Sequence, residues 1–570
     1  MKTTTVAEYL AKIFYKCGIR HVFFIPVIAV KLLKEMEKIG IKRIIPHSEK
    51  AAAYMADGYA RIRKKPSLCM AQSVGAFNLA SGLQDAFLSS SPVIAITGRR
   101  PGHEQQRNAY QEVDHECIFK NITKYHNYLN SPEHTALVIN QAIKESTSAC
   151  PGPVHIDIGG FTGHGLSKSI ITQEHKFYKQ FVNIPPIRVL PENKIIISFL
   201  ENLKKSKTPL FVVGGGAIHS NAGLQFKKTI EKFKIPFVTS LNAKGIIPEN
   251  HKLCMGVVGQ YSRKCSNIIV SKSDLIIYLG SKTGSLVTNE WNIPNLDTEI
   301  IRVDINQSEL GRNYPLRLGI YSDIAAFLEK IIESKNEFKS KKSWLNFCFE
   351  EKNKWYKENH LFLNSNSTPI RPERLCKEIT KALPKNGILV SDTGHAGIWT
   401  STMFEIMNKN QNYLRCAGSL GWAFPASLGV KCAVPERPVI CFTGDGGIWY
   451  HLSEFDTAIK YGINVVTIIN NNHSYNQEKE VNETMYGSIS KGSDELWKLP
   501  DTNFAKIAES FGGVGVTITD PNELNKCIKD SLAIKKPVLI DVKTDINAIA
   551  PSAHIPRYQH KNINIIHNTL

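Results

Sequence analysis

Short apolar runs alternate with amphipathic stretches along most of the chain. The runs are bounded by glycine, proline or asparagine, as buried strands are, and the stretches between them carry apolar residues at helical spacing. One such unit is an apolar run at Pro438 to Phe442, an amphipathic stretch over 451–461 and a second apolar run over 465–469. A strand, a helix and a strand in this order predict a βαβ crossover with parallel strands. The pattern therefore predicts an α/β fold.

The alternation falls into three blocks of similar size. The first is expected to contain strands at HVFFIPV, KRIIP, SPVIAITG and GPVHIDI and to end in the loop FTGHGLSKS. The second block opens at TPLFVVGGGAIHSNA and the third at GILVSDTG. We expect each block to form a doubly wound parallel sheet, with domains over 1–165, 190–330 and 371–550, a linker with a connecting helix over 331–370, and a tail over 551–570.

Acidic and amide side chains follow the two strands of the βαβ unit. Asp445 lies between glycines after the first strand, and Asn470, Asn471 and Asn472 follow the second. Because both strands end at the same edge of the sheet, these side chains are expected to converge. Their oxygens suit Mg²⁺ bridged to a phosphate, and the glycines would let backbone amides approach that phosphate. An ordinary Gly-Asp-Gly turn and a plain strand end are the alternative.

Length and charge limit the classes of function. A chain of 570 residues is too long for one core, and 42% apolar with 21% charged residues is ordinary for a soluble globular protein. The net charge of +19 comes from lysines scattered through every segment, without a basic stripe interleaved with aromatic residues. We therefore expect a lysine-rich solvated surface and no nucleic-acid partner.

Cysteine usage and hydropathy bear on the compartment. The twelve cysteines occur singly, without a Cys-x-x-Cys pair or a His/Cys cluster at zinc spacing, which predicts buried thiols in a reducing compartment. The N-terminus is typical of an amphipathic helix over Val6 to Cys17 rather than of a signal peptide, and no window is long enough to span a membrane. A cytoplasmic protein without a membrane partner is expected.

The βαβ unit resembles the diphosphate and Mg²⁺ signature of thiamine diphosphate enzymes. Gly444-Asp445-Gly446, 24 intervening residues and Asn471-Asn472 match it in residue type, spacing and setting. The resemblance implies Mg²⁺ ligands from Asp445, Asn472 and the backbone carbonyl of Ser474. Asn470 is extra to the motif, so a register shifted by one residue stays open. Cofactor contacts are also implied for the glycines of the turn, which are Gly444, Gly446 and Gly447.

The resemblance extends to the three-domain plan of thiamine diphosphate decarboxylases and acetohydroxyacid synthases, in which the first domain holds the aminopyrimidine, the third holds the diphosphate and the middle one is a Rossmann-like spacer. HSEKAAAYMADGYAR resembles the family's glutamate motif, which implies that Glu49 hydrogen-bonds pyrimidine N1′. Taken alone, Glu49 could be a first-turn helix charge. QSVGAFNLASGLQDAF is similar to the family's glycine-rich segment and puts Gly75 and Asn78 on cofactor-side positions, although Asn78 alone could be a helix cap.

Further matches mark the surroundings of the cofactor. AYQEVDHECIF places Gln111 where acetohydroxyacid synthases carry the glutamine of Phe-Gln-Glu, near the active site. AGSLGWAFPASLG implies that Leu420 props the cofactor into its bent shape and that the Gly418 carbonyl accepts from the 4′-amine. Gly394 and His395 resemble the loop over the diphosphate, with histidine in place of the usual glutamine. Phosphate binding, substrate contact and neither role are all open for His395.

The catalytic residues of related enzymes, matched to this sequence, indicate which reaction to expect. Glu478 falls where pyruvate decarboxylases carry a catalytic glutamate, and an exposed helix charge is the alternative. The adjacent His-His pair of those enzymes is absent, and the active-site histidine and serine of benzoylformate decarboxylase fall on Ala71 and Ile28. The resemblance implies an acetolactate-synthase-like carboligase, which decarboxylates a 2-oxo acid and transfers the acyl-anion equivalent to an acceptor carbonyl. A non-ligating decarboxylase of the benzoylformate type and a non-catalytic cofactor-binding scaffold are the alternatives.

The implied cofactors are thiamine diphosphate and Mg²⁺, whereas FAD is in doubt. Gly214 to Gly216 follow a strand, but Gly-x-Gly-x-x-Gly is incomplete, and SKTGSLVTNEW stands where acetohydroxyacid synthases carry Arg-Phe-Asp-Asp. FFIPVIAV replaces the family's Phe-Gly-x-Pro-Gly, so Val27 and Ile28 are expected to narrow the pocket mouth. The substrates would be a 2-oxo acid and an aldehyde or a second 2-oxo acid. A homodimer or homotetramer is implied, because the pyrimidine and diphosphate domains of this family meet across a subunit contact.

Overall fold

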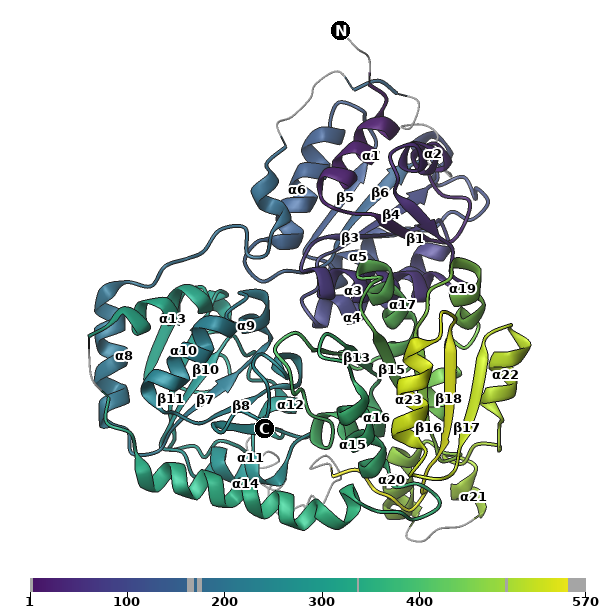
Figure 1. Ribbon diagram of the computed structural model, residues 1–570. Coiled ribbons are helices and arrows are strands. Elements are labelled where there is room, and N and C mark those ends of the chain that lie inside the picture. The colour runs from purple at the N-terminus through teal and green to yellow at the C-terminus, as the bar shows by residue number, and fades with distance from the viewer. Residues whose placement is uncertain (1–3, 161–168, 172–176, 336–337, 487–490, 552–570) are drawn as a thin grey trace.

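Three lobes make up the molecule in the computed structural model (Figure 1). The structure describes residues 4–160, 169–171, 177–335, 338–486 and 491–551. Each lobe contains one six-stranded sheet with parallel strand pairs, which confirms the expected α/β fold. The predicted boundary loop over 161–168 and the predicted tail from residue 552 lie outside the described residues. In the described part of the chain, no helix combines the length and the apolar character that a membrane span needs.

The first lobe carries the helix that begins at Glu49. Its strands are β1 (His21–Phe24), β2 (Lys42–Ile44), β3 (Ser67–Gln72), β4 (Val93–Arg99), β5 (Tyr125–Leu129) and β6 (Val154–Gly159), and its helices include α1 (Val6–Lys16), α2 (Val30–Lys38), α3 (Glu49–Arg63), α4 (Gly75–Leu88), α5 (Glu116–Ile122) and α6 (Thr135–Thr147). The sheet order is β2-β1-β3-β4-β6-β5. Ser48 caps α3, since its side chain accepts from the Ala51 amide at 3.1 Å.

The middle lobe has the strand order of a Rossmann fold. Its strands are β7 (Pro209–Val213), β8 (Phe237–Thr239), β9 (Cys254–Val257), β10 (Leu275–Leu279), β11 (Glu299–Asp304) and β12 (Leu318–Tyr321), and its helices include α8 (Asn193–Lys205), α9 (Gly215–His219), α10 (Gly223–Phe233), α11 (Lys264–Ser271), α12 (Ser285–Thr288) and α13 (Ile324–Glu333). The order β12-β11-β10-β7-β8-β9 becomes 3-2-1-4-5-6 when the strands are counted within the lobe and read from β9. The predicted connecting helix is α14 (Lys342–Leu363), which buries Trp344, Cys348 and Trp355.

The third lobe repeats the strand order of the first. Its strands are β13 (Ile388–Ser391), β14 (Asn412–Arg415), β15 (Val439–Gly444), β16 (Val466–Asn471), β17 (Val514–Ile518) and β18 (Val538–Lys543), and its helices include α15 (Pro372–Ala382), α16 (Gly394–Thr402), α17 (Ala423–Ala433), α18 (Asp445–Ile448), α19 (Glu454–Tyr461), α20 (Asn476–Tyr486), α21 (Lys491–Asp494), α22 (Phe504–Ser510) and α23 (Leu524–Ala533). The order is β14-β13-β15-β16-β18-β17. Strands β15 and β16 pair in parallel and are joined through α18 and α19, as the βαβ pattern predicts.

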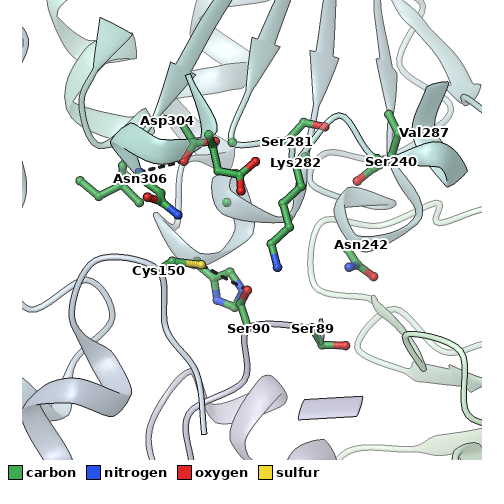
Figure 2. A pocket seen from close by; sticks show the side chains of 18 of the residues that line it. Ser89, Ser90, Cys150, Ser240, Asn242, Ser281, Lys282, Val287, Asp304 and Asn306 are labelled. Carbon is green, nitrogen blue, oxygen red and sulfur yellow. Dashed lines mark hydrogen bonds between the residues drawn. The ribbon is translucent and has the colours of Figure 1, made fainter. Parts of the chain in front are cut away.

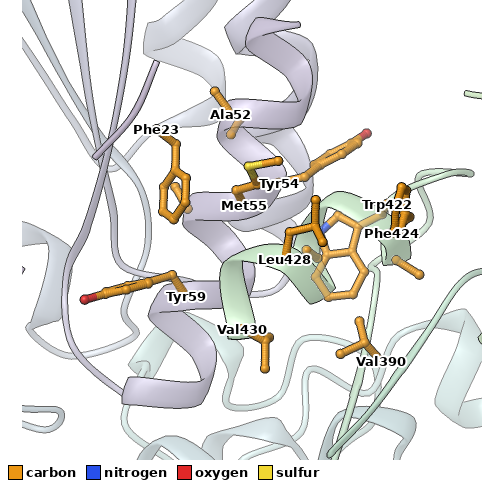
Figure 3. Close-up of a cluster of buried hydrophobic side chains, with 14 of the residues drawn as sticks. Phe23, Ala52, Tyr54, Met55, Tyr59, Val390, Trp422, Phe424, Leu428 and Val430 are labelled. Carbon is orange, nitrogen blue, oxygen red and sulfur yellow. The ribbon is translucent and has the colours of Figure 1, made fainter. Parts of the chain in front are cut away.

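Helix α3 of the first lobe crosses α17 of the third lobe at close range. A Cβ on Gly58 would lie 2.2 Å from the carbonyl oxygen of Ala426, and one on Gly429 would lie 1.9 Å from that of Met55. Such short backbone separations require glycine. One hydrophobic core, which includes the fully buried Trp422, continues through this crossing and joins the two lobes (Figure 3).

Two buried carboxylates also connect these lobes. The indole Nε1 of Trp422 donates to Asp57 Oδ2 at 2.9 Å. Asp85 on α4 accepts hydrogen bonds from three consecutive backbone amides, those of residues 417–419, at 2.9 to 3.3 Å. The first lobe therefore holds the loop before α17, which contains the predicted cofactor residue Gly418.

Candidate active site

A cavity of about 380 Å³ opens at the carboxyl edge of the third sheet. It lies beside the neighbouring strands β13 and β15, which is the switch point of the strand order and the place where open α/β sheets bind ligands. The ends of β13, β15 and β16 and the loop before α17 line it. We call this cavity the third-lobe pocket.

The predicted metal residues converge in the third-lobe pocket. Asp445 Oδ2 accepts from the backbone amide of Ser474, and Oδ1 accepts from that of Gly446, both at 2.9 Å. Asn472 Oδ1 accepts from Ser474 Oγ at 2.8 Å, and all three predicted residues are buried. Burial raises the pKa of Asp445 to about 6, so a cation beside this carboxylate would offset the cost of keeping it charged.

The three asparagines alternate in direction along the end of β16, as residues of a strand do. Asn470 and Asn472 line the third-lobe pocket, and within the described residues the buried Oδ1 of Asn470 has no hydrogen-bond partner. Asn471 turns away from the pocket and donates from Nδ2 to Asp541 Oδ1 at 2.7 Å. Asn472, the predicted ligand, therefore shares the pocket with Asn470 and not with Asn471.

The glycines of the predicted motif form part of the pocket wall. A Cβ on Gly446 would lie 2.3 Å from the ring of Tyr475, and one on Gly447 would lie 2.7 Å from Thr443 Oγ1. Gly444 meets nothing within 4 Å and faces open space. Side chains at these positions would collide with the wall or fill the cavity, which explains the run of glycines around Asp445.

The other residues predicted for the third lobe also line the pocket. They are Gly394, His395, Gly418, Leu420 and Glu478. Gly394 has a φ of +64°, which favours glycine. Burial lowers the pKa of His395 to about 4, so the pocket wall contains a neutral imidazole, and its buried Nδ1 has no partner in the described structure. Glu478 is exposed in the first turn of α20.

The residues predicted for the first lobe gather at a second place. Asn78 Nδ2 donates to Glu49 Oε2 at 3.2 Å, and because Asn78 lies inside α4 it caps no helix end there. A Cβ on Gly75 would lie 2.4 Å from Glu49 Oε1. Ser73 Oγ donates to the carbonyl of Gln111, and both residues have left-handed backbones, with φ values of 35° and 59°. We call Glu49, Gly75, Asn78 and Gln111 the Glu49 group.

The Glu49 group does not reach the third-lobe pocket of its own chain. None of its four residues is among those that line the pocket in the described structure. One chain therefore carries the two predicted halves of the site at separate places.

Two buried aspartates near the pocket were not among the predicted residues. Asp392 accepts from the Gly421 amide at 3.0 Å and from Thr443 Oγ1 at 3.1 Å, and burial raises its pKa to about 6. Asp85 holds the loop before α17, as described above. Asp392 ends the apolar stretch ILVSD, and Asp85 interrupts LASGLQDAF. An aspartate at a position where the pattern predicts burial is a signal that could have identified both residues.

The expectation that Ile28 narrows the pocket mouth is wrong. Ile28 is fully buried in the core of the first lobe, where it contacts apolar side chains. Val27 is 51% exposed and has a φ of 74°, a conformation that strains a β-branched residue. The replacement of the family's glycine thus leaves a strained valine at the surface.

Three family models match successive parts of the chain. The thiamine pyrophosphate enzyme N-terminal TPP binding domain matches residues 4–118, the central domain matches 196–331 and the C-terminal TPP binding domain matches 392–542. A probable acetolactate synthase large subunit from Methanocaldococcus jannaschii is 31% identical over 88% of this chain and 85% of its own length. The chain belongs to the acetolactate synthase family of thiamine pyrophosphate enzymes.

Two further relatives extend the match. A probable acetolactate synthase large subunit from Methanococcus aeolicus is 30% identical over 90% of this chain and 88% of its own length. An acetolactate synthase large subunit from Haemophilus influenzae is 29% identical over 96% of this chain and 95% of its own length. Family membership confirms the predicted class, a thiamine diphosphate-dependent carboligase that acts on 2-oxo acids.

Proposed function

We propose that this enzyme decarboxylates one 2-oxo acid and joins the remaining acyl unit to the carbonyl of a second 2-oxo acid or an aldehyde. The observation that carries the proposal is the buried oxygen site of Asp445, Asn470 and Asn472 at the switch point of the third sheet. The relatives named acetolactate synthase support ligation over simple decarboxylation.

The residues of the third-lobe pocket fit Mg²⁺ and a diphosphate. The Asp445 carboxylate and the amide oxygens of Asn470 and Asn472 are hard donors, and the Asn470 oxygen is otherwise unpaired within the described residues. Asp445, Asn472 and the Ser474 carbonyl would hold the ion. Gly444 leaves open space for the phosphate groups beside them.

Residues of the Glu49 group and of the third-lobe pocket would together orient the cofactor and the substrates. When bound, thiamine diphosphate supplies the carbon nucleophile and the electron sink. Glu49 would hold a proton at pyrimidine N1′, while Asn78 orients its carboxylate through the bond to Oε2. The Gly418 carbonyl would accept from the 4′-amine, and Leu420 would support the bend of the cofactor.

Three side chains are assigned to substrate and proton handling. His395 is a neutral imidazole in the pocket wall, so its unpaired Nδ1 would form a hydrogen bond with the substrate or with a phosphate group. Gln111 would bind an acceptor oxygen from the loop beside Gly75. Glu478, exposed at the pocket rim, would exchange protons with solvent.

We also propose that the complete site forms between two copies of the chain. Large apolar side chains are exposed beside both halves of the site: Val74, Phe77 and Tyr110 near the Glu49 group are 44%, 38% and 73% exposed, and Trp449 and Tyr450 after Asp445 are 45% and 52% exposed. Exposed apolar side chains that gather in this way mark association surfaces. A symmetric dimer would cover both surfaces and bring the Glu49 group of each copy to the third-lobe pocket of the other.

Mass spectrometry of the products tests the proposed reaction. The purified enzyme is given thiamine diphosphate, Mg²⁺ and pairs of 2-oxo acids and aldehydes. We expect 2-hydroxyketone products from the wild type and their loss in Glu49→Gln with cofactor binding retained. Glu116→Gln, which changes another first-turn acid of the first lobe, should keep full activity. Unchanged products from Glu49→Gln would defeat the proposal.

A second cavity, of about 410 Å³, lies at the switch point of the middle sheet between β7 and β10. Figure 2 shows Lys282 and Asp304 of the middle lobe on its wall, with Ser90 and Cys150 of the first lobe below them. Leu286 and Arg415 line both this cavity and the third-lobe pocket, so the two cavities adjoin.

We propose that the second cavity binds a nucleotide-type cofactor. Asp304 ends β11 at the sheet edge where an acid can accept from a ribose hydroxyl, and the glycines after β7 leave a backbone wall. The replacement of Arg-Phe-Asp-Asp by SKTGSLVTNEW weighs against FAD. To test this proposal, the purified protein is denatured and any released nucleotide is identified. A flavin would show that the cofactor is FAD, and another nucleotide would support a different cofactor of the same class. A protein that releases no nucleotide would contradict this part of the proposal.

The cytoplasm stays the predicted location. All twelve cysteines are free thiols and most are buried, which supports a reducing compartment. Fractionation of the source cells with activity measured in each fraction would test this prediction.

A further inference from the structure

The first lobe contains a cluster of buried polar side chains that the proposed reaction does not use. Thr97 on β4, His155 and Asp157 on β6, and His115 just before α5 are all 0% exposed. The ligand atoms of His115, His155 and Asp157 lie within 4.8 Å of one another. We call these four residues the Asp157 cluster.

The donor atoms of the Asp157 cluster lie close together. Thr97 Oγ1 lies 2.8 Å from Asp157 Oδ1 and 2.6 Å from His155 Nε2. His115 Nδ1 lies 3.1 Å from Asp157 Oδ1 and 3.2 Å from Thr97 Oγ1. Tetrahedral zinc with ligand bonds of about 2.0 to 2.1 Å separates its ligand atoms by about 3.3 Å. The ligand atoms of His115, His155 and Asp157 thus gather around the Thr97 hydroxyl, and small shifts of these side chains would let all of them reach one ion.

The hydrogen atoms of the cluster do not satisfy its acceptors. His115 Nε2 lies 3.0 Å from the Ser73 carbonyl, which only accepts, so Nε2 carries the proton. The Nδ1 of a neutral His115 then points a lone pair at the Asp157 carboxylate. His155 Nε2 can donate to the Thr97 hydroxyl, whose single proton goes to Asp157 Oδ1, so none is left for the contact between His115 Nδ1 and Asp157. A divalent ion bound to His115 Nδ1 and Asp157 Oδ1 would satisfy both atoms.

The surroundings favour the metal ion. The second nitrogen of each histidine is held from behind, that of His115 by the Ser73 carbonyl and that of His155 by His126 Nδ1 at 2.7 Å. Arg99 approaches only the other oxygen of Asp157, at 3.7 Å, and leaves Oδ1 to the cluster.

We propose that His115, His155 and Asp157, together with the Thr97 hydroxyl, bind a divalent transition-metal ion such as Zn²⁺. Two imidazoles and a carboxylate are a ligand set that Zn²⁺ takes in proteins, and the Thr97 hydroxyl would occupy the fourth position. The ion would fix His115 against the Ser73 carbonyl and, through the bond from Ser73 Oγ, the carbonyl of Gln111. Its role would be to stiffen the two loops that carry Gly75 and Gln111.

Metal analysis of the full-length chain tests the proposal. All variants are made in an Asp445→Asn background, so that the third-lobe pocket takes up little divalent ion, and are expressed with zinc and dialysed against a chelator. We expect about one zinc per chain in this background and in the control His251→Gln, a histidine of the middle lobe, and loss of the zinc in His155→Gln. Zinc that persists in His155→Gln would overturn the assignment.

Cobalt provides a second measurement in case His155→Gln does not fold. The Asp445→Asn protein, refolded with Co²⁺, should show the strong visible absorption of a four-coordinate ion, and prior loading with Zn²⁺ should prevent it. A parent protein that retains no zinc and shows no such band would also overturn the proposal.

Discussion

Replacing Gly75 by alanine tests how the Glu49 carboxylate is positioned. The new Cβ would lie 2.4 Å from Glu49 Oε1, whereas ordinary contact begins at 3.4 Å, so the carboxylate would have to move by about 1 Å. Because the obstructing atom is the end of a flexible side chain, the fold should accommodate the change. A displacement of about 1 Å at a reacting group can cost about 100-fold in rate, or about 2.7 kcal/mol.

The assay for Gly75→Ala is kcat/KM for 2-oxo acid consumption at saturating thiamine diphosphate and Mg²⁺, together with the thermal unfolding midpoint. We expect about a 100-fold lower kcat/KM with a nearly unchanged midpoint. Gly102→Ala is the matched control, because a Cβ at this first-lobe glycine meets nothing within 4 Å. Full activity in Gly75→Ala would refute the view that Gly75 sets the position of the Glu49 carboxylate.

Three further changes have defined outcomes. Burial raises the pKa of Asp445 from its ordinary 3.8 to about 6. The group therefore contributes stability below about pH 4, and this stability is lost as the pH rises through 6 and the carboxylate becomes charged. Mg²⁺ with cofactor should offset that loss, so it should raise the thermal unfolding midpoint more at about pH 7 than at about pH 5. Equal shifts at both pH values would contradict this, and Asp445→Asn should abolish the difference. Trp422→Phe removes the hydrogen-bond donor to the buried Asp57 and should lower the free energy of unfolding in urea by about 1 to 3 kcal/mol. A smaller decrease would argue against a stabilising hydrogen bond between Trp422 and Asp57. Val27→Gly should stabilise the protein by about 1 kcal/mol in the same assay. The change removes the backbone strain of a valine at φ 74°, and this gain should exceed the cost of the greater conformational entropy that glycine gives the unfolded chain. A destabilised variant would show that the folded protein stores no strain at this position.

Elements with regular apolar spacing were predictable from the sequence, and elements without it were not. Helix α3 (Glu49–Arg63) can be predicted from the sequence, because a serine at its N-cap precedes a run of small apolar residues. Strand β5 (Tyr125–Leu129) has the sequence YHNYL and lies at the sheet edge, where no apolar run is needed, so no strand was predicted there. Hydrophobic periodicity detects an element by its buried apolar face. An edge strand such as β5 buries little of its surface, so its sequence carries no such pattern.

Site residues were predictable where a motif is local and not where a contact joins distant segments. Asp445 and Asn472 belong to one βαβ unit, and their convergence follows from parallel strands that end at one edge. The turning away of Asn471 follows from strand alternation and could have been predicted. Asp85 reaches the amides of residues 417–419 from another lobe, a pairing that no local pattern encodes.

The most direct test of the two-copy site mixes two inactive variants. Glu49→Gln and Asp445→Asn chains are unfolded together, refolded with cofactor and assayed for 2-oxo acid ligation. If each site joins the Glu49 group of one copy to the Asp445 pocket of the other, every mixed dimer contains one intact site, and an equal mixture should recover about a quarter of the wild-type activity. A mixture that stays as inactive as the separate variants, although mixed dimers form, would contradict a site shared between two copies.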